Sequence, residues 1–218
     1  MKRSNGRSSA NGRASSNGHA KSSTNGKSSG RTSSRSASSQ SSSSREGLEK
    51  VMKNGLKDIY YAEKQLVKAL NKMSKAAENE ELKQAFETHK AETEEQIARL
   101  EEAFEELGMR AVGKKCPAMD GLVEEGAEAI EEFEKGSARD AALIVSAQKV
   151  EHYEIAAYGS LRAFAATLGY TTCEQIFEEI LEQESNTDEI LNQVAQTVNE
   201  LAAQEDERMV DEEEMEEA

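Results

Sequence analysis

The sequence has few of the residues that break helices and few of those that build large aromatic cores. Its 218 residues include one proline, no tryptophan, five phenylalanines and five tyrosines. Alanine, glutamate, lysine and leucine are abundant instead, and this mixture favours helices over sheets. We therefore expect an all-α protein.

Long apolar runs are also missing, and cysteine is scarce. No stretch approaches the roughly 20 apolar residues of a membrane-spanning helix, and the N-terminus lacks the apolar segment of a secretory signal. The only cysteines, Cys116 and Cys173, have no partner at metal-ligand spacing, which argues against a thiolate zinc site. We expect no membrane association, a cytoplasmic location and two free thiols, unless the fold pairs the two cysteines.

Acidic residues are absent from the first part of the chain. Residues 1–45 are rich in Ser, Asn and Gly and carry nine Lys or Arg, whereas the remainder carries 18 basic and 42 acidic residues, a net charge of −24. We expect 1–45 to be a disordered basic arm. Such an arm can bind DNA or another polyanion, or it can serve as a spacer. The wide spacing of its charges and its lack of aromatics favour the spacer.

Helical periodicity begins after this arm. Ser43 and Glu46 form a capping-box pattern that predicts the start of order, with a possible interruption at Gly55 and a helix reaching Ala77. Apolar residues that recur at helical spacing, here called apolar stripes, predict three further long helices. These run from Asn79 to Leu107, from a Ser137 cap to Leu168, and from a Thr172–Gln175 capping box to about residue 204. A short helix is expected over 122–133, and residues 205–218 form an acidic tail.

The lengths of the connections predict the architecture. Short turns near residues 79 and 170 make two antiparallel hairpins, and a connection of nearly 30 residues joins them. Four long helices with one long crossover are typical of a ferritin-like four-helix bundle. We assign this bundle to residues 46–204.

The most informative feature is a set of polar residues inside the apolar stripes of the four long helices. A stripe this regular should face the core, where an unpaired carboxylate is costly. These residues are Glu63, His89, Glu92, Glu151, Glu154, Glu184 and Asp188.

Counting ~1.5 Å per residue from each turn places Glu63, Glu92, Glu154 and Glu184 at one level along the bundle. Clustered carboxylates with an imidazole suit iron or manganese, so the pattern predicts a metal site, with iron as a di-iron centre favoured. The alternative is that these acids face solvent, as many glutamates do in soluble helices. His152, beside Glu151, lies about 100° round the helix and is interpreted as a residue that does not bind the metal.

Five segments resemble the YciF/YciE-type ferritin-like family of bacterial stress-associated proteins over about residues 46–203. They contain Leu56-Lys-Asp-Ile-Tyr-Tyr-Ala-Glu63, His89-Lys-Ala-Glu92, Lys115-Cys116-Pro-Ala-Met119, Val150-Glu151-His152-Tyr-Glu154 and Leu181-Glu-Gln-Glu184-Ser-Asn-Thr-Asp188. The resemblance implies a ferritin-like bundle, a di-iron centre and a homodimer.

The chain departs from the ferritin and rubrerythrin pattern, which places Glu-x-x-His on the second and fourth helices. Here the second helix reads His89-x-x-Glu92, and the fourth has Asp188 and no histidine. One hypothesis is a redox-active di-iron protein that oxidises iron or reduces peroxide. The others are a non-catalytic protein tethered to a polyanion by its arm, and a metal-free helical stress protein.

Overall fold

The computed structural model describes residues 34–216, with side chains described from 43 to 204. This part of the chain contains five helices: α1 (Ser34–Ala76), α2 (Glu80–Glu106), α3 (Pro117–Glu132), α4 (Ser137–Leu168) and α5 (Thr171–Glu216). It contains no strand, so the prediction of an all-α protein is confirmed. None of these helices is both long and apolar enough to cross a membrane.

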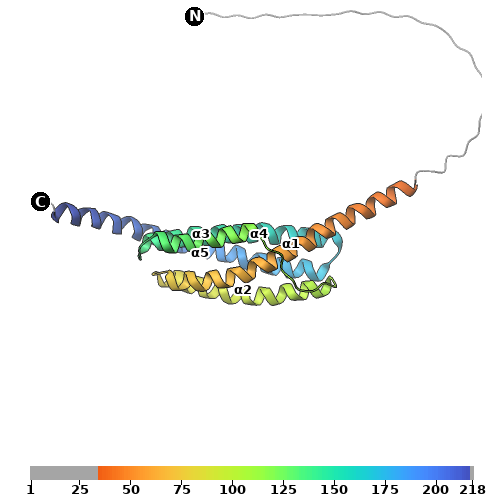
Figure 1. Cartoon of the computed structure of the whole chain (residues 1–218), viewed down its shortest axis with the longest axis horizontal. Coiled ribbons are helices and arrows are strands. Elements are labelled where there is room, and N and C mark those ends of the chain that lie inside the picture. Colours follow the sequence, from red (N-terminus) through yellow and green to blue (C-terminus); the bar gives the residue numbers. More distant parts are fainter. Residues whose placement is uncertain (1–33, 217–218) are drawn as a thin grey trace, which may run out of the picture.

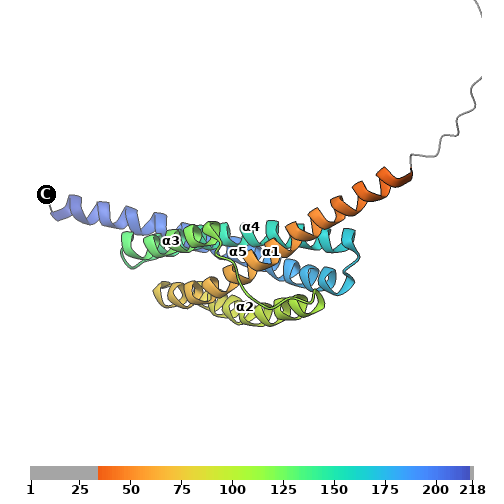
Figure 2. The ribbon, with the colours of Figure 1, turned by 45° about the vertical axis from the view of Figure 1, so that its right-hand side comes forward.

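Four helices form the bundle, and α3 lies on one side of it. Helices α1 and α2 form one hairpin and α4 and α5 the other, and the hairpins meet through α1 against α4 and α2 against α5. The long crossover carries α3, which packs on α4 and α1 (Figure 1). The first turns of α1 and the last turns of α5 extend beyond the bundle at opposite ends (Figure 2). The predicted ferritin-like architecture with one long crossover is therefore confirmed.

Helix α1 differs from its prediction at two places. It begins at Ser34, so the expected start near Ser43 and the arm boundary at residue 45 both fall inside it. Residues added to an existing helix avoid the cost of nucleation, which allows even a serine-rich segment to extend it. Gly55 does not interrupt the helix either. A Cβ at Gly55 would lie 3.1 Å from Leu161 Cδ2, so glycine lets α1 approach α4 closely. The arm residues 1–33 lie outside the described part.

Three other helix starts were predicted a few residues away from where they lie. Helix α3 begins at Pro117 and not at residue 122, because proline fits the first helical position. Gly136 precedes α4 with φ 150°, a conformation that favours glycine, so the predicted cap Ser137 is already helical. Helix α5 starts with the hydrogen bond from Glu174 N to Tyr170 O, ahead of the predicted capping box.

The turn between α1 and α2 is held by caps from two helices. Asn79 Oδ1 accepts a hydrogen bond from Leu82 N at 3.0 Å, as its predicted role as N-cap requires. The buried carboxylate of Asp140, in the first turn of α4, accepts Glu78 N at 2.9 Å and Asn79 N at 2.6 Å. One side chain thus ties the first hairpin to the second.

Replacing Asp140 with alanine should leave two backbone N–H groups of this turn without their acceptor. We expect Asp140→Ala to lower the free energy of unfolding by about 1–3 kcal/mol, measured by urea denaturation. Glu95→Ala, which removes an exposed carboxylate from the middle of α2, serves as the control. Equal unfolding midpoints for the two variants would contradict the role given to Asp140.

Candidate metal centre

Five polar side chains meet at the centre of the bundle. Glu63 comes from α1, His89 from α2, Glu151 and Glu154 from α4, and Glu184 from α5. Each is at most 2% exposed. Their neighbours along the stripes are apolar core residues, so the same periodicity that buries the core also buries these groups.

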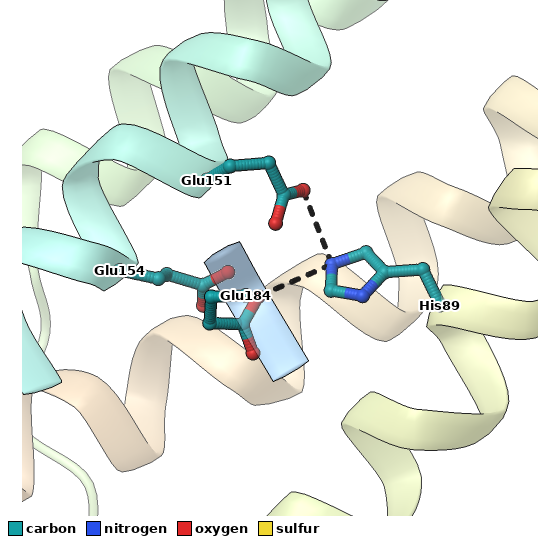
Figure 3. Close-up of side chains that lie close together, drawn as sticks. All are labelled: His89, Glu151, Glu154 and Glu184. Atoms are coloured by element: carbon teal, nitrogen blue, oxygen red, sulfur yellow. Dashed lines mark ion pairs between the residues drawn. The ribbon is translucent and has the colours of Figure 1, made fainter. Parts of the chain in front are cut away.

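The imidazole of His89 faces the carboxylates through its Nε2 atom. This nitrogen lies 3.2 Å from Glu151 Oε1 and 3.7 Å from Glu184 Oε2 (Figure 3). One ligand atom from each of His89, Glu151, Glu154 and Glu184 lies within 4.8 Å of the others. A space of this size suits one or two ions with several shared carboxylates.

Glu63 borders this group on the α1 side. Its Oε1 accepts a hydrogen bond from the buried hydroxyl of Tyr158. It is also close enough to Glu154 that the two carboxylates affect one another's charge. The structure thus brings five of the seven predicted site residues together.

Most of the inward-facing atoms lack a hydrogen-bond partner. They comprise five carboxylate oxygens, namely Glu63 Oε2, Glu151 Oε2, Glu184 Oε2 and both oxygens of Glu154, together with His89 Nε2, whose ion pair with Glu151 lacks hydrogen-bond geometry. Buried polar atoms without partners are rare in folded proteins because desolvation is costly. A cation among them would satisfy the oxygens and the nitrogen together, so the donor set fits a metal ion. Hard oxygens with one imidazole are ligands that suit iron and manganese.

The pKa values of the metal-free group also favour a bound cation. Burial raises the pKa of Glu154 and Glu184 well above the usual range and raises the pKa of Glu63 to about 7. Burial alone would lower the pKa of His89. The neighbouring carboxylates, Glu151 above all, outweigh burial and hold that pKa well above its usual value. Without metal, the group therefore retains protons that an ion would displace.

Residues around the group orient its members. Gln96 Nε2 donates to Glu184 Oε1 at 2.6 Å, and Thr187 Oγ1 lies 3.5 Å from His89 Nδ1. Helical spacing predicts Gln96 and Tyr158 as core residues, and the sequence also suggests Tyr158 as an electron donor or hydrogen-bond partner of the site, but gives no such role to Gln96. Thr187 was not singled out, although it lies three residues after Glu184 and so on the same helix face.

Glu92 and Asp188 lie outside the buried group. Glu92 Oε2 is 3.9 Å from the outer nitrogen of His89, Nδ1, and its side chain is 32% exposed. It lines a groove of about 630 Å³ between α2 and α5. Asp188 faces the exposed His152 at 3.4 Å. Helix α2 therefore contributes His89, and not Glu92, to the level at which the carboxylates meet. His152 lies away from the centre, in agreement with its interpretation from the sequence.

Both cysteines are buried and free, as predicted. Cys116 Sγ lies 3.1 Å from the Tyr153 hydroxyl, and Cys173 is near the Ala103 carbonyl. Burial raises the pKa of Cys173 to about 11, so its thiol stays protonated near neutral pH. Neither belongs to the group of possible metal ligands found among the described residues.

A family model described as a domain of unknown function, DUF892, matches residues 47–204. The chain belongs to this family. It is 48% identical over 149 residues to Protein YciF of Escherichia coli K12, a match that covers 68% of this chain and 90% of that protein. The YciF-type resemblance of the sequence motifs is thereby confirmed.

Solved structures of relatives share this fold. The E. coli stress protein YciF superposes with a TM-score of 0.68 at 46% identity, covering 70% of this chain and 97% of that one. YcfI of Rhodopseudomonas palustris gives 0.65 at 43% identity, covering 66% and 92%. A Xanthomonas campestris protein gives 0.56 at 26% identity, covering 75% and 99%.

The raised pKa of Glu63 makes the stability of the metal-free protein depend on pH. The folded state holds this proton up to about pH 7, whereas the unfolded chain releases it near 4.5. Stability should therefore fall as the pH rises through this window, and the proton on His89 acts in the same direction above pH 6.5. We expect the free energy of unfolding to be higher at pH 5 than at pH 8, by on the order of 1–3 kcal/mol.

Urea denaturation of chelator-treated protein across this range measures the effect. Glu63→Gln removes one of these titrating groups and should make the profile shallower. A wild-type profile that rises toward pH 8, or one that matches the variant, would contradict the assignment.

Proposed function

We propose that this chain holds a dinuclear metal centre, with iron as the favoured metal, between Glu63, His89, Glu151, Glu154 and Glu184. The observation that carries the proposal is the set of five carboxylate oxygens and one imidazole nitrogen that face one another, buried and without hydrogen-bond partners. The prediction that Glu92 and Asp188 are also ligands is not kept, because both lie at the edge of the group.

Charge balance favours two ions over one. Four ionised glutamates and a neutral imidazole carry a charge of −4, and a net charge of this size in an apolar core is very costly. Two divalent cations neutralise it. A single ion would leave two carboxylates either charged or protonated. Manganese is the alternative metal, because it accepts the same oxygen-rich ligands.

Iron in this position would supply a reversible one-electron redox couple, and we propose that the protein oxidises iron or reduces peroxide. The protein's own side chains hold the ligands in place. The Tyr158 hydroxyl orients the carboxylate of Glu63, and Gln96 orients that of Glu184. The E. coli relative YciF is described as a stress protein, and this description agrees with such a role.

The location, the oligomeric state and the role of the basic arm are also part of the proposal. A cytoplasmic location fits two buried, unpaired cysteines, since reducing compartments keep thiols free. A homodimer is retained from the family resemblance. A spacer remains the favoured role of the basic arm. Binding of nucleic acid, the alternative, would involve this arm alone, because the remainder of the chain carries a net charge of −24.

Metal analysis after anaerobic loading with Fe(II) tests the centre directly. We expect about two iron ions per chain, and less than half of that in Glu154→Ala, which loses the ligand with two unpaired oxygens. Asp188→Asn is the matched control, since Asp188 lies one turn from Glu184 on the same helix. It should bind the wild-type amount.

Two results would count against a dinuclear centre. One is a wild-type content of about one iron per chain or less. The other is equal iron content in wild type and Glu154→Ala. Circular dichroism of each metal-free variant separates loss of ligand from loss of fold.

A further inference from the structure

A small cavity lies beneath α3, between this helix and helices α1 and α4. It has a volume of about 30 Å³, which is room for roughly two water-sized molecules. Most of its wall is formed by apolar side chains, among them Leu66, Leu70, Met73, Val123, Ile130 and Val150.

Two of the three polar residues in the wall, Ser146 and Lys72, leave little for water to bind. The hydroxyl of Ser146 already donates to Ala142 O at 3.0 Å. Lys72 is exposed, so its side chain reaches solvent at the rim. A buried water usually needs two to four polar partners, and apolar cavities that lack them stay dry. A cation here would exchange its hydration shell for a single free carboxylate oxygen, that of Glu151, so this is not a route for metal ions.

The remaining polar wall residue is Glu151, which connects the cavity to the candidate metal centre. Glu151 is 1% exposed, and its Oε2 has no hydrogen-bond partner. Its other oxygen faces His89 Nε2 at 3.2 Å, as Figure 3 shows. A molecule in the cavity therefore lies against a residue of the centre.

The opposite side of the centre is lined by acidic side chains instead of apolar ones. The groove between α2 and α5 is lined by Glu80, Glu81 and Glu92 and reaches His89. Ions and hydrogen-bonding molecules are suited to that groove. The cavity under α3 suits a neutral, apolar molecule of two or three atoms.

We propose that the cavity beneath α3 is a binding site for dioxygen, which it holds against Glu151 at the edge of the centre. The small volume of the cavity favours a molecule of this size, and its wall disfavours peroxide, which needs more hydrogen-bond partners than the one free oxygen of Glu151. The role of this site in oxidation by dioxygen rests on the proposed iron centre. Binding of a small apolar molecule in the cavity does not depend on iron.

Gly126, in α3, provides a way to fill the cavity. It lines the wall, and a Cβ placed there would lie 3.7 Å from Met73 Sδ and 3.8 Å from Ser146 Cβ, both at ordinary contact distance. Gly126→Val adds two methyl groups beyond this point, enough to occupy a space of this size. Gly121→Val is the matched control, because the same substitution in the same helix meets nothing within 4 Å.

Xenon is a suitable probe, since it enters dry apolar cavities. Methyl NMR spectra of the full-length, metal-free protein under xenon pressure should show shifts at Leu66, Leu70 and Val150. We expect these shifts to be lost in Gly126→Val and kept in Gly121→Val. If the valine variant does not fold, Gly126→Ala replaces it in the test. Its single methyl fits, so this variant should fold normally and show weakened xenon shifts. Absence of shifts in wild type, or their persistence in both Gly126 variants, would overturn the proposal.

A second measurement links the cavity to dioxygen. In iron-loaded protein, Gly126→Val should slow oxidation by dissolved oxygen several-fold and leave oxidation by hydrogen peroxide at the rate of Gly121→Val. Equal rates with dioxygen in the two variants, or equal slowing with both oxidants, would refute the assignment to dioxygen. If the protein fails to load iron, the proposed centre is wrong, and the xenon experiment still decides whether the cavity binds a small apolar molecule.

Discussion

The burial of four carboxylates around one imidazole is the constraint on which the rest of the bundle depends. Three helices place these glutamates in a core that water does not reach, so each one must be protonated, paired or bound to a cation. The surrounding contacts limit the choice. Tyr158 and Gln96 each satisfy one oxygen, and five other oxygens stay without partners. A structure that served only stability would replace such a group with apolar side chains, as buried ion pairs often can be.

Periodicity and connection lengths were enough to predict the bundle and the level of the site, but they could not predict how each helix is rotated. Glu92 and His89 lie three residues apart, about 60° round the helix axis, and both fit the same level. Packing of α2 against α5 turns His89 inward and leaves Glu92 at the groove. Asp188 turns toward His152 on α4 for the same reason. The sequence alone also could not show that Gly55 permits a close approach between helices, because that role depends on Leu161 from α4.

The long crossover has a structural role beyond joining the two hairpins. Its helix α3 packs on both α1 and α4, so it covers the side of the centre to which Glu151 belongs. Glycine at position 126 keeps the space between this helix and Met73 open. The polar groove and the apolar cavity therefore lie on opposite sides of the same group, and only the second depends on the crossover. A four-helix bundle with a bare connection would expose Glu151 to solvent on this side.

The two hairpins resemble one another in the spacing of their glutamates, with 29 residues from Glu63 to Glu92 and 30 from Glu154 to Glu184, yet they do not contribute equally. The first supplies Glu63 and His89, and the second supplies Glu151, Glu154 and Glu184. His89 directs Nε2 inward, while Thr187 and Glu92 lie near its Nδ1, an arrangement that fixes which nitrogen can bind a metal. The ligands of the proposed centre therefore differ from side to side, with the imidazole of His89 on the α2 side and carboxylates alone on the α1 and α4 side. Because hard oxygen ligands stabilise the more oxidised state of iron, the preponderance of carboxylates would favour the ferric state if the proposed iron were bound there.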